Sequence, residues 1–351
     1  MEDTMEDKGR LVAGKLPRAQ LQRMLSKLTI NDPRVLLGGR VGEDAALIDF
    51  GPTTLIAKTD PITFATDLIG WYAVQVNAND IAACGGIPKW LLATVLVPEG
   101  AHITEVEAIF DQLDRATQSL NVSLVGGHTE ITYGLPRPVV CCSMLGEVPS
   151  GKAITTGGAN PGDTILLTKG IAIEGTALLA REVAAQLTEL DVPESTIESA
   201  RGLLFNPGIS VVNEARIAVE AGGVTSMHDP TEGGLASALA EIAEAAGTGL
   251  EVLFDNVHVL EETEVICKAI GADPWGLIAS GSLLITTHPK NASKIIQLLQ
   301  ADGILVTEIG YVLPHDAGLS VTSANGKRPM PEFARDELAR VLEVLNLPIT
   351  G

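Results

Sequence analysis

The residues best suited to chemistry lie in the stretch SMHDPTEGGL, which combines a histidine, an Asp-Pro-Thr run, a second acid and two glycines. An apolar run precedes this stretch and ASALAEIAEAAG follows it at helical spacing, so it should connect a strand to a helix. His228 is a candidate acid–base group, and Asp229 is a candidate for the polar catalytic role. Thr231, Gly233 and Gly234 could bind an anion, because N–H groups at a helix start point outward and attract negative charge. The alternative is a turn that begins a helix, with His228 as a hydrogen-bonded structural residue.

Further acids stand beside glycine or another polar residue, near the ends of predicted strands or within a predicted helix. They are Asp44 in VGEDAALI, Asp60 in AKTDPIT, Asp80 in VNANDIAACGG and Glu130 in VGGHTEIT. Taken singly, each could be a turn residue or a solvated surface carboxylate. Taken together, they offer the oxygen ligands that Mg²⁺ prefers, and a bound Mg²⁺ can bridge carboxylates to phosphates.

Asp80 differs from the other acids because its surroundings are apolar. The residues 68–86 read as a helix closed by glycines, on which Asn77, Asp80 and Cys84 share one face. A helix this apolar is mostly buried, and a buried carboxylate must find a partner. That partner could be a backbone N–H group, a lysine or a magnesium ion.

Three glycine pairs lie near the acids, at residues 38–39, 126–127 and 233–234. The pair at 126–127 should form a turn at the end of a strand that begins near residue 122. None of the three belongs to a GxxxxGK[ST] or GxGxxG motif, and one pair alone is typical of a tight turn. Acids and glycines in combination indicate a metal–triphosphate site, because glycine lets backbone N–H groups approach an anion closely.

The elements that must position these residues alternate between strand and helix through both halves of the chain, which predicts an α/β (α+β) fold. In the first half, 53–60 and 89–98 read as strands and 104–120 as a helix with Thr104 as its N-cap and Glu107 completing a capping box. In the second half, 174–189 reads as a helix. The stretch PSGKAITTGGANPGD reads as a linker, so we place an N-terminal domain at 1–150 and a C-terminal domain at 151–351.

Composition excludes some classes of function. The 351-residue chain has 44 acidic against 24 basic residues, a net charge of −20, which repels a phosphate backbone and argues against nucleic-acid binding. No stretch is apolar for long enough to cross a membrane, and the acidic N-terminus does not resemble a signal peptide. The four cysteines form no CxxC pair, which fits buried thiols in a reducing cytoplasm.

The stretches GEDAALID, KTDPIT, GWYAVQVNANDIAACGGIPKW, VGGHTEIT and MHDPTEGGLASALAEIAEAA, in this order, resemble the PurM-like, aminoimidazole ribonucleotide synthase-related superfamily. The last of them is most similar to the Asp-Pro-Thr-Arg-Gly-Gly-Leu segment of the hydrogenase maturation factor HypE. The resemblance extends from about Gly14 to the C-terminal helix. It implies two α/β domains, an ATP site in the first, and a homodimer that pairs through strands of this domain, with ATP near the subunit junction.

The resemblance also implies roles for individual residues. Asp44, Asp60 and Asp80 would hold Mg²⁺, with Glu130 as a further candidate ligand. The nucleotide would be bound by Asn79, Gly126, Gly127, His128 and Thr129 of the first domain and by Thr231, Gly233 and Gly234 of the second. His228 and Asp229 would face the site from the second domain.

Four features depart from the HypE pattern. HypE proteins end in a cysteine that carries a carbamoyl group, whereas this chain ends in NLPITG and its last cysteine is Cys267. The arginine after Asp-Pro-Thr is replaced by Glu232, which removes a phosphate partner. Residues 126–130 replace HypE's Gly-Asp-Thr turn, and GKLPRAQLQRML replaces its glycine-rich N-terminus.

Three functions therefore stay open. The first is an ATP- and Mg²⁺-dependent HypE-like enzyme that activates a substrate oxygen by phosphorylation and acts on a small molecule or a partner protein. The second is a small-molecule kinase similar to thiamine monophosphate kinase. The third is a non-catalytic, nucleotide-binding assembly factor.

Overall fold

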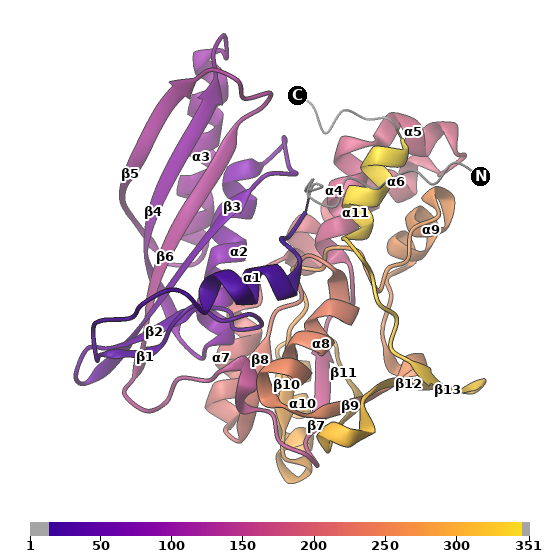
Figure 1. The fold of residues 1–351 in the computed structure, drawn as a ribbon. Coiled ribbons are helices and arrows are strands. Elements are labelled where there is room, and N and C mark those ends of the chain that lie inside the picture. The colour runs from indigo at the N-terminus through magenta and orange to yellow at the C-terminus, as the bar shows by residue number, and fades with distance from the viewer. Residues whose placement is uncertain (1–13, 346–351) are drawn as a thin grey trace, which may run out of the picture.

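A computed structural model describes residues 14–345, which form two mixed sheets and the helices that pack on them (Figure 1). The first sheet has the order β1-β2-β3-β6-β4-β5. All neighbours in it are antiparallel except β4 and β5. Its strands are β1 (Val35–Leu37), β2 (Ala46–Asp49), β3 (Thr53–Ile62), β4 (Ile87–Pro98), β5 (Ser123–Thr132) and β6 (Val139–Pro149).

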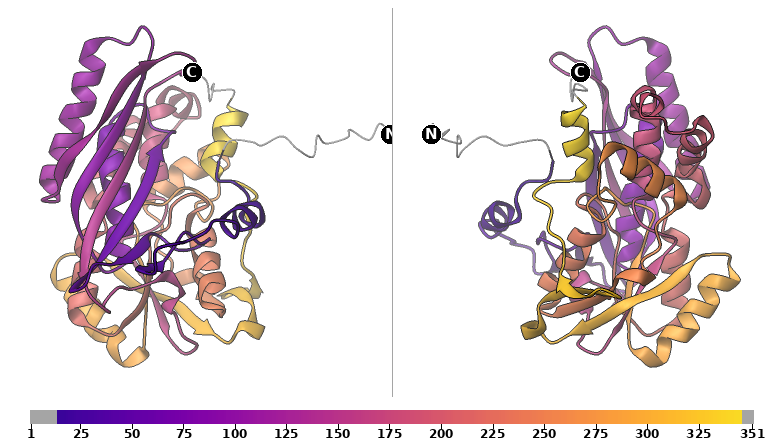
Figure 2. Two further views of the ribbon diagram at one scale, coloured as in Figure 1. Left: turned by 60° about the vertical axis from the view of Figure 1, so that its left-hand side comes forward. Right: turned by 90° about the vertical axis from the view of Figure 1, so that its right-hand side faces the viewer.

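Two helices, α2 (Ile69–Ala83) and α3 (Ile103–Ser119), lie on one face of this sheet (Figure 2). Strand β6 alternates between buried and half-buried side chains, as a strand with one covered face should. All residues of α2 except Trp71 are buried, because α2 packs on the sheet, on α3 and on α7 and β8 of the second half. The buried central helix expected from the sequence is thus present, between the two halves of the molecule.

The second sheet has seven strands in the order β13-β12-β9-β11-β7-β10-β8. Only β9 and β12 are parallel. Its strands are β7 (Thr164–Thr168), β8 (Val224–His228), β9 (Gly249–Leu253), β10 (Leu284–Thr287), β11 (Val306–Leu313), β12 (Leu319–Ser323) and β13 (Gly326–Pro329). Its helices are α4 (Ile173–Glu182), α5 (Ala184–Glu189), α6 (Glu194–Gly202), α7 (Val212–Ala221), α8 (Gly234–Ala246), α9 (Glu261–Ile270), α10 (Pro289–Ala301) and α11 (Glu337–Val344).

Three expectations from the sequence were wrong in detail. His102, not Thr104, is the N-cap of α3: its ring accepts from the Thr104 N–H, and Glu105 completes the capping box. The helix expected at 174–189 is two helices, because Val183 leaves the helical conformation between them. Gly126 and Gly127 form no turn but continue within β5, where β4 pairs with them.

A short helix, α1 (Arg18–Leu25), crosses in front of the first sheet's lower end in Figure 1 and buries none of its side chains. The C-terminal stretch that lacks the HypE cysteine lies outside the described residues. Among residues 14–345, no helix has the length and apolar character needed to cross a membrane.

Candidate active site

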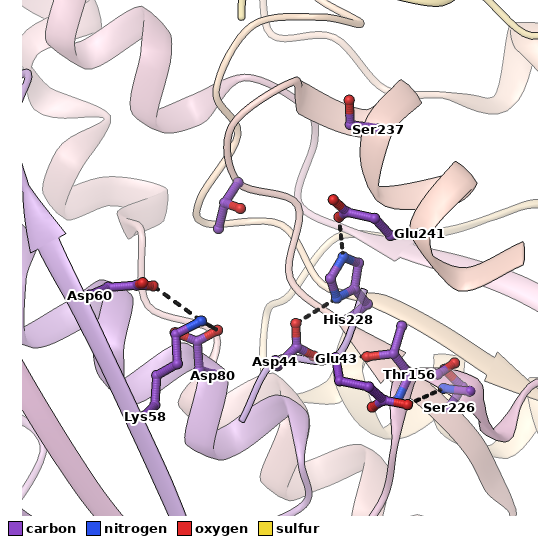
Figure 3. Close-up of polar contacts among 12 residues, drawn as sticks. Glu43, Asp44, Lys58, Asp60, Asp80, Thr156, Ser226, His228, Ser237 and Glu241 are labelled. Atoms are coloured by element: carbon purple, nitrogen blue, oxygen red, sulfur yellow. Dashed lines mark hydrogen bonds and ion pairs between the residues drawn. The ribbon is translucent and has the colours of Figure 1, made fainter. Parts of the chain in front are cut away.

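A group of acids, of which Asp44, Asp80 and Asp229 are buried and Asp60 is half-buried, lies where β3, α2 and the loop after β8 meet (Figure 3). Lys58 on β3 stands between two of them: its Nζ is 3.2 Å from Asp60 Oδ2 and 3.1 Å from Asp80 Oδ1. Of the three partners considered for Asp80, the structure provides a lysine. Asp80 Oδ2, in contrast, has no hydrogen-bond partner among the described residues.

The second half of the group is an ion triad around His228. Its Nδ1 lies 2.6 Å from Asp44 Oδ1, and its Nε2 lies 2.9 Å from Glu241 Oε2 on α8. Burial lowers the pKa of His228. The charges and hydrogen bonds of Asp44 and Glu241 raise the pKa by more, so that it lies well above the usual value for histidine. His228 is therefore an imidazolium with both N–H groups engaged, which excludes it as a metal ligand or general base in this arrangement.

Asp229 is the buried acid of this site with the fewest hydrogen-bond partners among the described residues. It is 1% exposed, and neither of its carboxylate oxygens has a partner among the described residues. Burial, and after it the charge of Asp44, raises the pKa of Asp229 to about 8, although His228 and Lys58 oppose the shift. Burying an ionised carboxylate without a partner costs free energy, so Asp229 should either carry a proton or bind a cation.

The pKa values around Lys58 reflect the same crowding of charge. Burial raises the pKa of Asp80, and the charges of Asp229 and Asp60 raise it further, while Lys58 opposes the shift. Burial lowers the pKa of Lys58, but the carboxylates around it raise the net pKa well above its usual value. Lys58 therefore stays charged, and one ammonium is shared among several acids.

The Gly-rich linker between the two sheets also contributes to the site. Glu43 accepts hydrogen bonds from the N–H groups of Thr156 (3.1 Å) and Gly157 (3.3 Å). The Thr156 hydroxyl donates to Asp44 Oδ2 at 3.2 Å, and Ser226 binds the Thr156 carbonyl. The linker thus fixes Asp44 against the His228 loop.

A divalent cation fits these residues. One ligand atom each of Asp44, His228 and Asp229 lie within 4.8 Å of one another. Because both nitrogens of His228 are engaged, the ligands would be carboxylate oxygens of Asp44 and Asp229. Asp80 Oδ2 on α2, which has no partner among the described residues, is a further candidate. Oxygen donors of this kind suit Mg²⁺.

Two predicted anion-binding groups are engaged elsewhere, which corrects the sequence interpretation. Asn79 donates to the Ile209 carbonyl and accepts from the Val211 N–H, both at 2.8 Å, so its amide holds the chain before α7 and not a phosphate. At the start of α8, the Gly233 N–H donates to Asp336, and the Gly234 N–H donates to the Thr231 carbonyl.

The predicted residues on β5 lie apart from the acids of the same chain. Gly126, Gly127, His128, Thr129 and Glu130 are exposed on the edge strand, and Glu130 pairs with His128 at 3.3 Å. Strands β6 and β4 separate β5 from β3, which carries Lys58 and Asp60. Glu130 is thus not a ligand within the cluster formed by one chain.

Sequence reasoning missed Lys58 and Glu241 as individual members of the site. Lys58 stands two residues before Asp60, so that both lie on the same face of β3, and this spacing is the signal that could have identified it. Glu241 lies two turns into a largely apolar helix, and its burial could have been read from the apolar residues on either side.

Residues 42–148 match the AIR synthase related protein, N-terminal domain, and residues 160–321 match the AIR synthase related protein, C-terminal domain. The chain therefore belongs to the AIR synthase related family.

Several curated relatives span most of the chain. A putative hydrogenase expression/formation protein of Methanocaldococcus jannaschii is 26% identical over 326 residues, covering 91% of this chain and 93% of the relative. A carbamoyl dehydratase HypE of Rhizobium leguminosarum is 26% identical and covers 86% of each chain. A thiamine-monophosphate kinase of Bacillus subtilis is 31% identical, over 70% of this chain and 73% of its own.

Solved structures share the fold. A chain of a HypE–HypF complex has a TM-score of 0.72 at 22% identity, and the match covers 90% of this chain and all of that chain. A HypE structure in complex with ATP has a TM-score of 0.69 at 24% identity, with 93% and 98% covered. At this identity the likeness shows the fold.

Proposed function

We propose that this member of the AIR synthase related family binds ATP with Mg²⁺ and uses it to activate a substrate oxygen by phosphorylation, in the manner of HypE-like hydrogenase maturation factors. The observation that carries the proposal is the buried carboxylate of Asp229. Neither of its oxygens has a partner among residues 14–345, and the same is true of one oxygen of the buried Asp80. A protein keeps such uncompensated acids where a cation completes the site. The HypE relatives and the HypE structure in complex with ATP support ATP as the nucleotide, and carboxylate oxygens of this kind suit Mg²⁺ as the cation.

The residues divide the work of phosphoryl transfer. Asp229, Asp44 and Asp80 would hold Mg²⁺, which when bound would neutralise charge on the phosphates. Lys58 pairs with both Asp60 and Asp80 and so restrains both side chains. His228, held from both sides by Asp44 and Glu241, keeps its proton and fixes the position of Asp44, because a hydrogen-bonded imidazolium cannot turn away.

A kinase similar to thiamine-monophosphate kinase is the second candidate. The observation in its favour is the Bacillus subtilis relative, which has the higher identity but covers less of the chain than the hydrogenase-related proteins do. A non-catalytic assembly factor is the third possibility, and it would bind ATP without turnover. The three candidates differ in what accepts the phosphoryl group of ATP: a substrate of hydrogenase maturation, a small molecule such as thiamine monophosphate, or nothing.

We further propose that the chain works as a homodimer in the cytoplasm, with ATP near the junction of two copies. The four free cysteines fit a reducing compartment. The residues His128 to Glu130, which lie away from their own chain's acids, would then serve the site at the junction, and they would do so from the edge strand β5.

Calorimetry with ATP, in the presence and absence of Mg²⁺, tests the binding step. We expect Mg²⁺-dependent binding that Asp229→Asn and Asp80→Asn weaken by at least about tenfold, since each removes a charged ligand. Asp111→Asn, at an exposed position on α3, is the matched control and should bind like the unaltered protein. An ATP affinity that does not depend on Mg²⁺, or that neither substitution lowers, contradicts the proposed site.

ADP release then identifies the reaction. Release stimulated by a hydrogenase-maturation partner, but not by thiamine monophosphate, supports the HypE-like function. Stimulation by thiamine monophosphate supports the kinase, and tight ATP binding without release under either condition supports the assembly factor.

A further inference from the structure

The segment before α1 docks on the loop that carries Asp229. The Lys15 Nζ donates to Thr231 Oγ1 at 2.9 Å, and the Lys15 backbone N–H donates to Glu232 Oε2 at 3.0 Å. These contacts join residues more than two hundred positions apart in the sequence. The N-terminal segment therefore covers the loop between β8 and α8.

Arg18, the first residue of α1, provides a second attachment, which extends the segment onto α8. Its guanidinium donates to the Ser237 carbonyl at 2.9 Å and lies 3.2 Å from Glu241 Oε1. Glu241 is also the carboxylate that binds His228. The segment thus contacts the ion triad as well as the Asp229 loop.

Charge pairs and hydrogen bonds, more than apolar packing, hold this segment in place. Helix α1 buries no side chain, and Lys15 is exposed. The Lys15 ammonium has three N–H donors, and the contact with Thr231 uses one of them. Burial raises the pKa of Glu232, and the charge of Lys15 opposes that shift, so the two groups lie close enough to stabilise each other.

The loop also needs a cation if it is to bind phosphate. The Gly233 N–H at the start of α8 already binds the Asp336 carboxylate, so the helix start lacks the donor that the sequence predicted for an anion. The described acids of the site outnumber Lys58 and His228, and a polyphosphate would add more negative charge. Lys15 brings a positive charge to this loop, and this charge helps to lower the pKa of Glu241.

We infer that Lys15 is a phosphate-binding residue of this site and that Glu232 positions it by holding its backbone. The inference rests on the proposed function and deepens it. The Lys15 ammonium lies at this loop through its contact with Thr231, and the Glu232 carboxylate holds the Lys15 backbone N–H. The cation at this loop therefore comes from the segment before α1, and Glu232 anchors this segment.

The test compares ligands that differ only in their phosphates. With Mg²⁺ present, Lys15→Met should weaken ATP binding about tenfold, the usual effect of losing one charge-assisted hydrogen bond, and should leave the affinity for adenosine within about twofold. Lys15→Arg should restore most of the ATP affinity. Glu232→Gln should weaken ATP binding less than Lys15→Met, and the double variant should bind ATP no more weakly than Lys15→Met alone.

Arg23→Met, in the last turn of the following helix α1, is the matched control and should bind both ligands as the unaltered protein does. Unchanged ATP affinity in Lys15→Met would overturn the inference while leaving the proposed function intact. Equal weakening of ATP and adenosine would also overturn it, because that pattern marks a structural role. An unaltered protein that binds no ATP with Mg²⁺ would overturn both.

Discussion

The buried carboxylate of Asp229 is suited to bind a cation, but the same burial lowers the stability of the folded protein when the carboxylate is ionised. Burial makes the ionised form of Asp229 costly and raises its pKa in the folded protein to about 8, against 3.8 for an ordinary aspartate. Below pH 3.8 the folded and unfolded forms both carry the proton. As pH rises from there through 8, the unfolded form loses the proton first, so the folded state loses stability.

Asp229→Asn removes this pH dependence. Without Mg²⁺, we expect the melting temperature of the variant to rise relative to that of the unaltered protein between pH 5 and pH 8, by several degrees, at about 2–4 °C per kcal/mol. Differential scanning fluorimetry at the two pH values measures the change. Mg²⁺ with ATP should raise the melting temperature of the unaltered protein and have little effect on the variant. Equal pH profiles for the two proteins would mean that Asp229 has a partner in solution.

His228 is the residue whose loss should cost most. His228→Gln leaves Asp44 buried without its cation and leaves Glu241 with Arg18 alone, for which we expect about 3 kcal/mol of destabilisation, measured by urea unfolding at pH 6. The raised pKa of His228 stabilises the fold below pH 6.5, and that contribution is lost as pH rises through the folded value. The pKa of Glu241, lowered to about 2 through its bond to His228 in spite of burial, adds stability above pH 4.5 that is lost as pH falls toward 2.

The two contributions overlap between about pH 4.5 and 6.5, so the cost of His228→Gln should be largest there. The exposed His128 provides the control, since His128→Gln should change the free energy of unfolding by less than about 0.5 kcal/mol. A cost for His228→Gln as small as this would show that the triad is not formed.

The candidate acids could be predicted from the sequence because each carries a local signal. Asp80 lies in an apolar helix, and Asp229 follows a strand and precedes two glycines. Their partners could not be predicted, because the contact between His228 and Asp44 joins residues 184 positions apart. Asn79 shows the same limit: a polar residue in a buried helix needed a partner, and the sequence could not show that backbone groups before α7 supply it.

At the scale of the elements, strand β5 is where the sequence interpretation was least accurate. Two adjacent glycines usually indicate a turn, but here they allow close pairing with β4. The strong α2 and α3 patterns were readable because amphipathic or uniformly apolar periods are local. The short strands β1, β2, β12 and β13 lacked such a pattern and depend on their neighbours for pairing.

Gly127 should be essential to β5, and Gly126 should not. A Cβ on Gly127 would lie 1.8 Å from the Ala93 carbonyl oxygen, whereas one on Gly126 would meet no atom within 4 Å. The two backbones have similar φ angles, 152° and 159°, so the pair isolates the steric contact. We expect Gly127→Ala to destabilise the protein by more than about 2 kcal/mol beyond Gly126→Ala, measured by urea unfolding. Equal effects would mean that β5 does not pair with β4 in this register.

At the scale of the whole molecule, β5 is an edge strand of ten residues, and none of them is fully buried in one chain. Leu124, Val125, Ile131 and Tyr133 are exposed along it and just beyond its end. A long edge with exposed apolar side chains is a template for pairing with another chain, and monomeric proteins usually protect such edges. The homodimer expected from the family resemblance would cover this edge.

Val125→Lys combined with Ile131→Lys should therefore halve the mass in solution, measured by light scattering after size exclusion, because two buried charges would oppose the interface. Leu190→Lys, at an exposed apolar residue of the second half, should leave the mass unchanged. If ATP binds near the junction, the monomeric variant should also bind ATP more weakly, although it retains Asp44, Asp80 and Asp229. A monomeric variant with full ATP affinity would place the nucleotide within one chain and would leave His128 and Glu130 without a role in binding it. An unaltered protein that is itself a monomer would contradict the dimer.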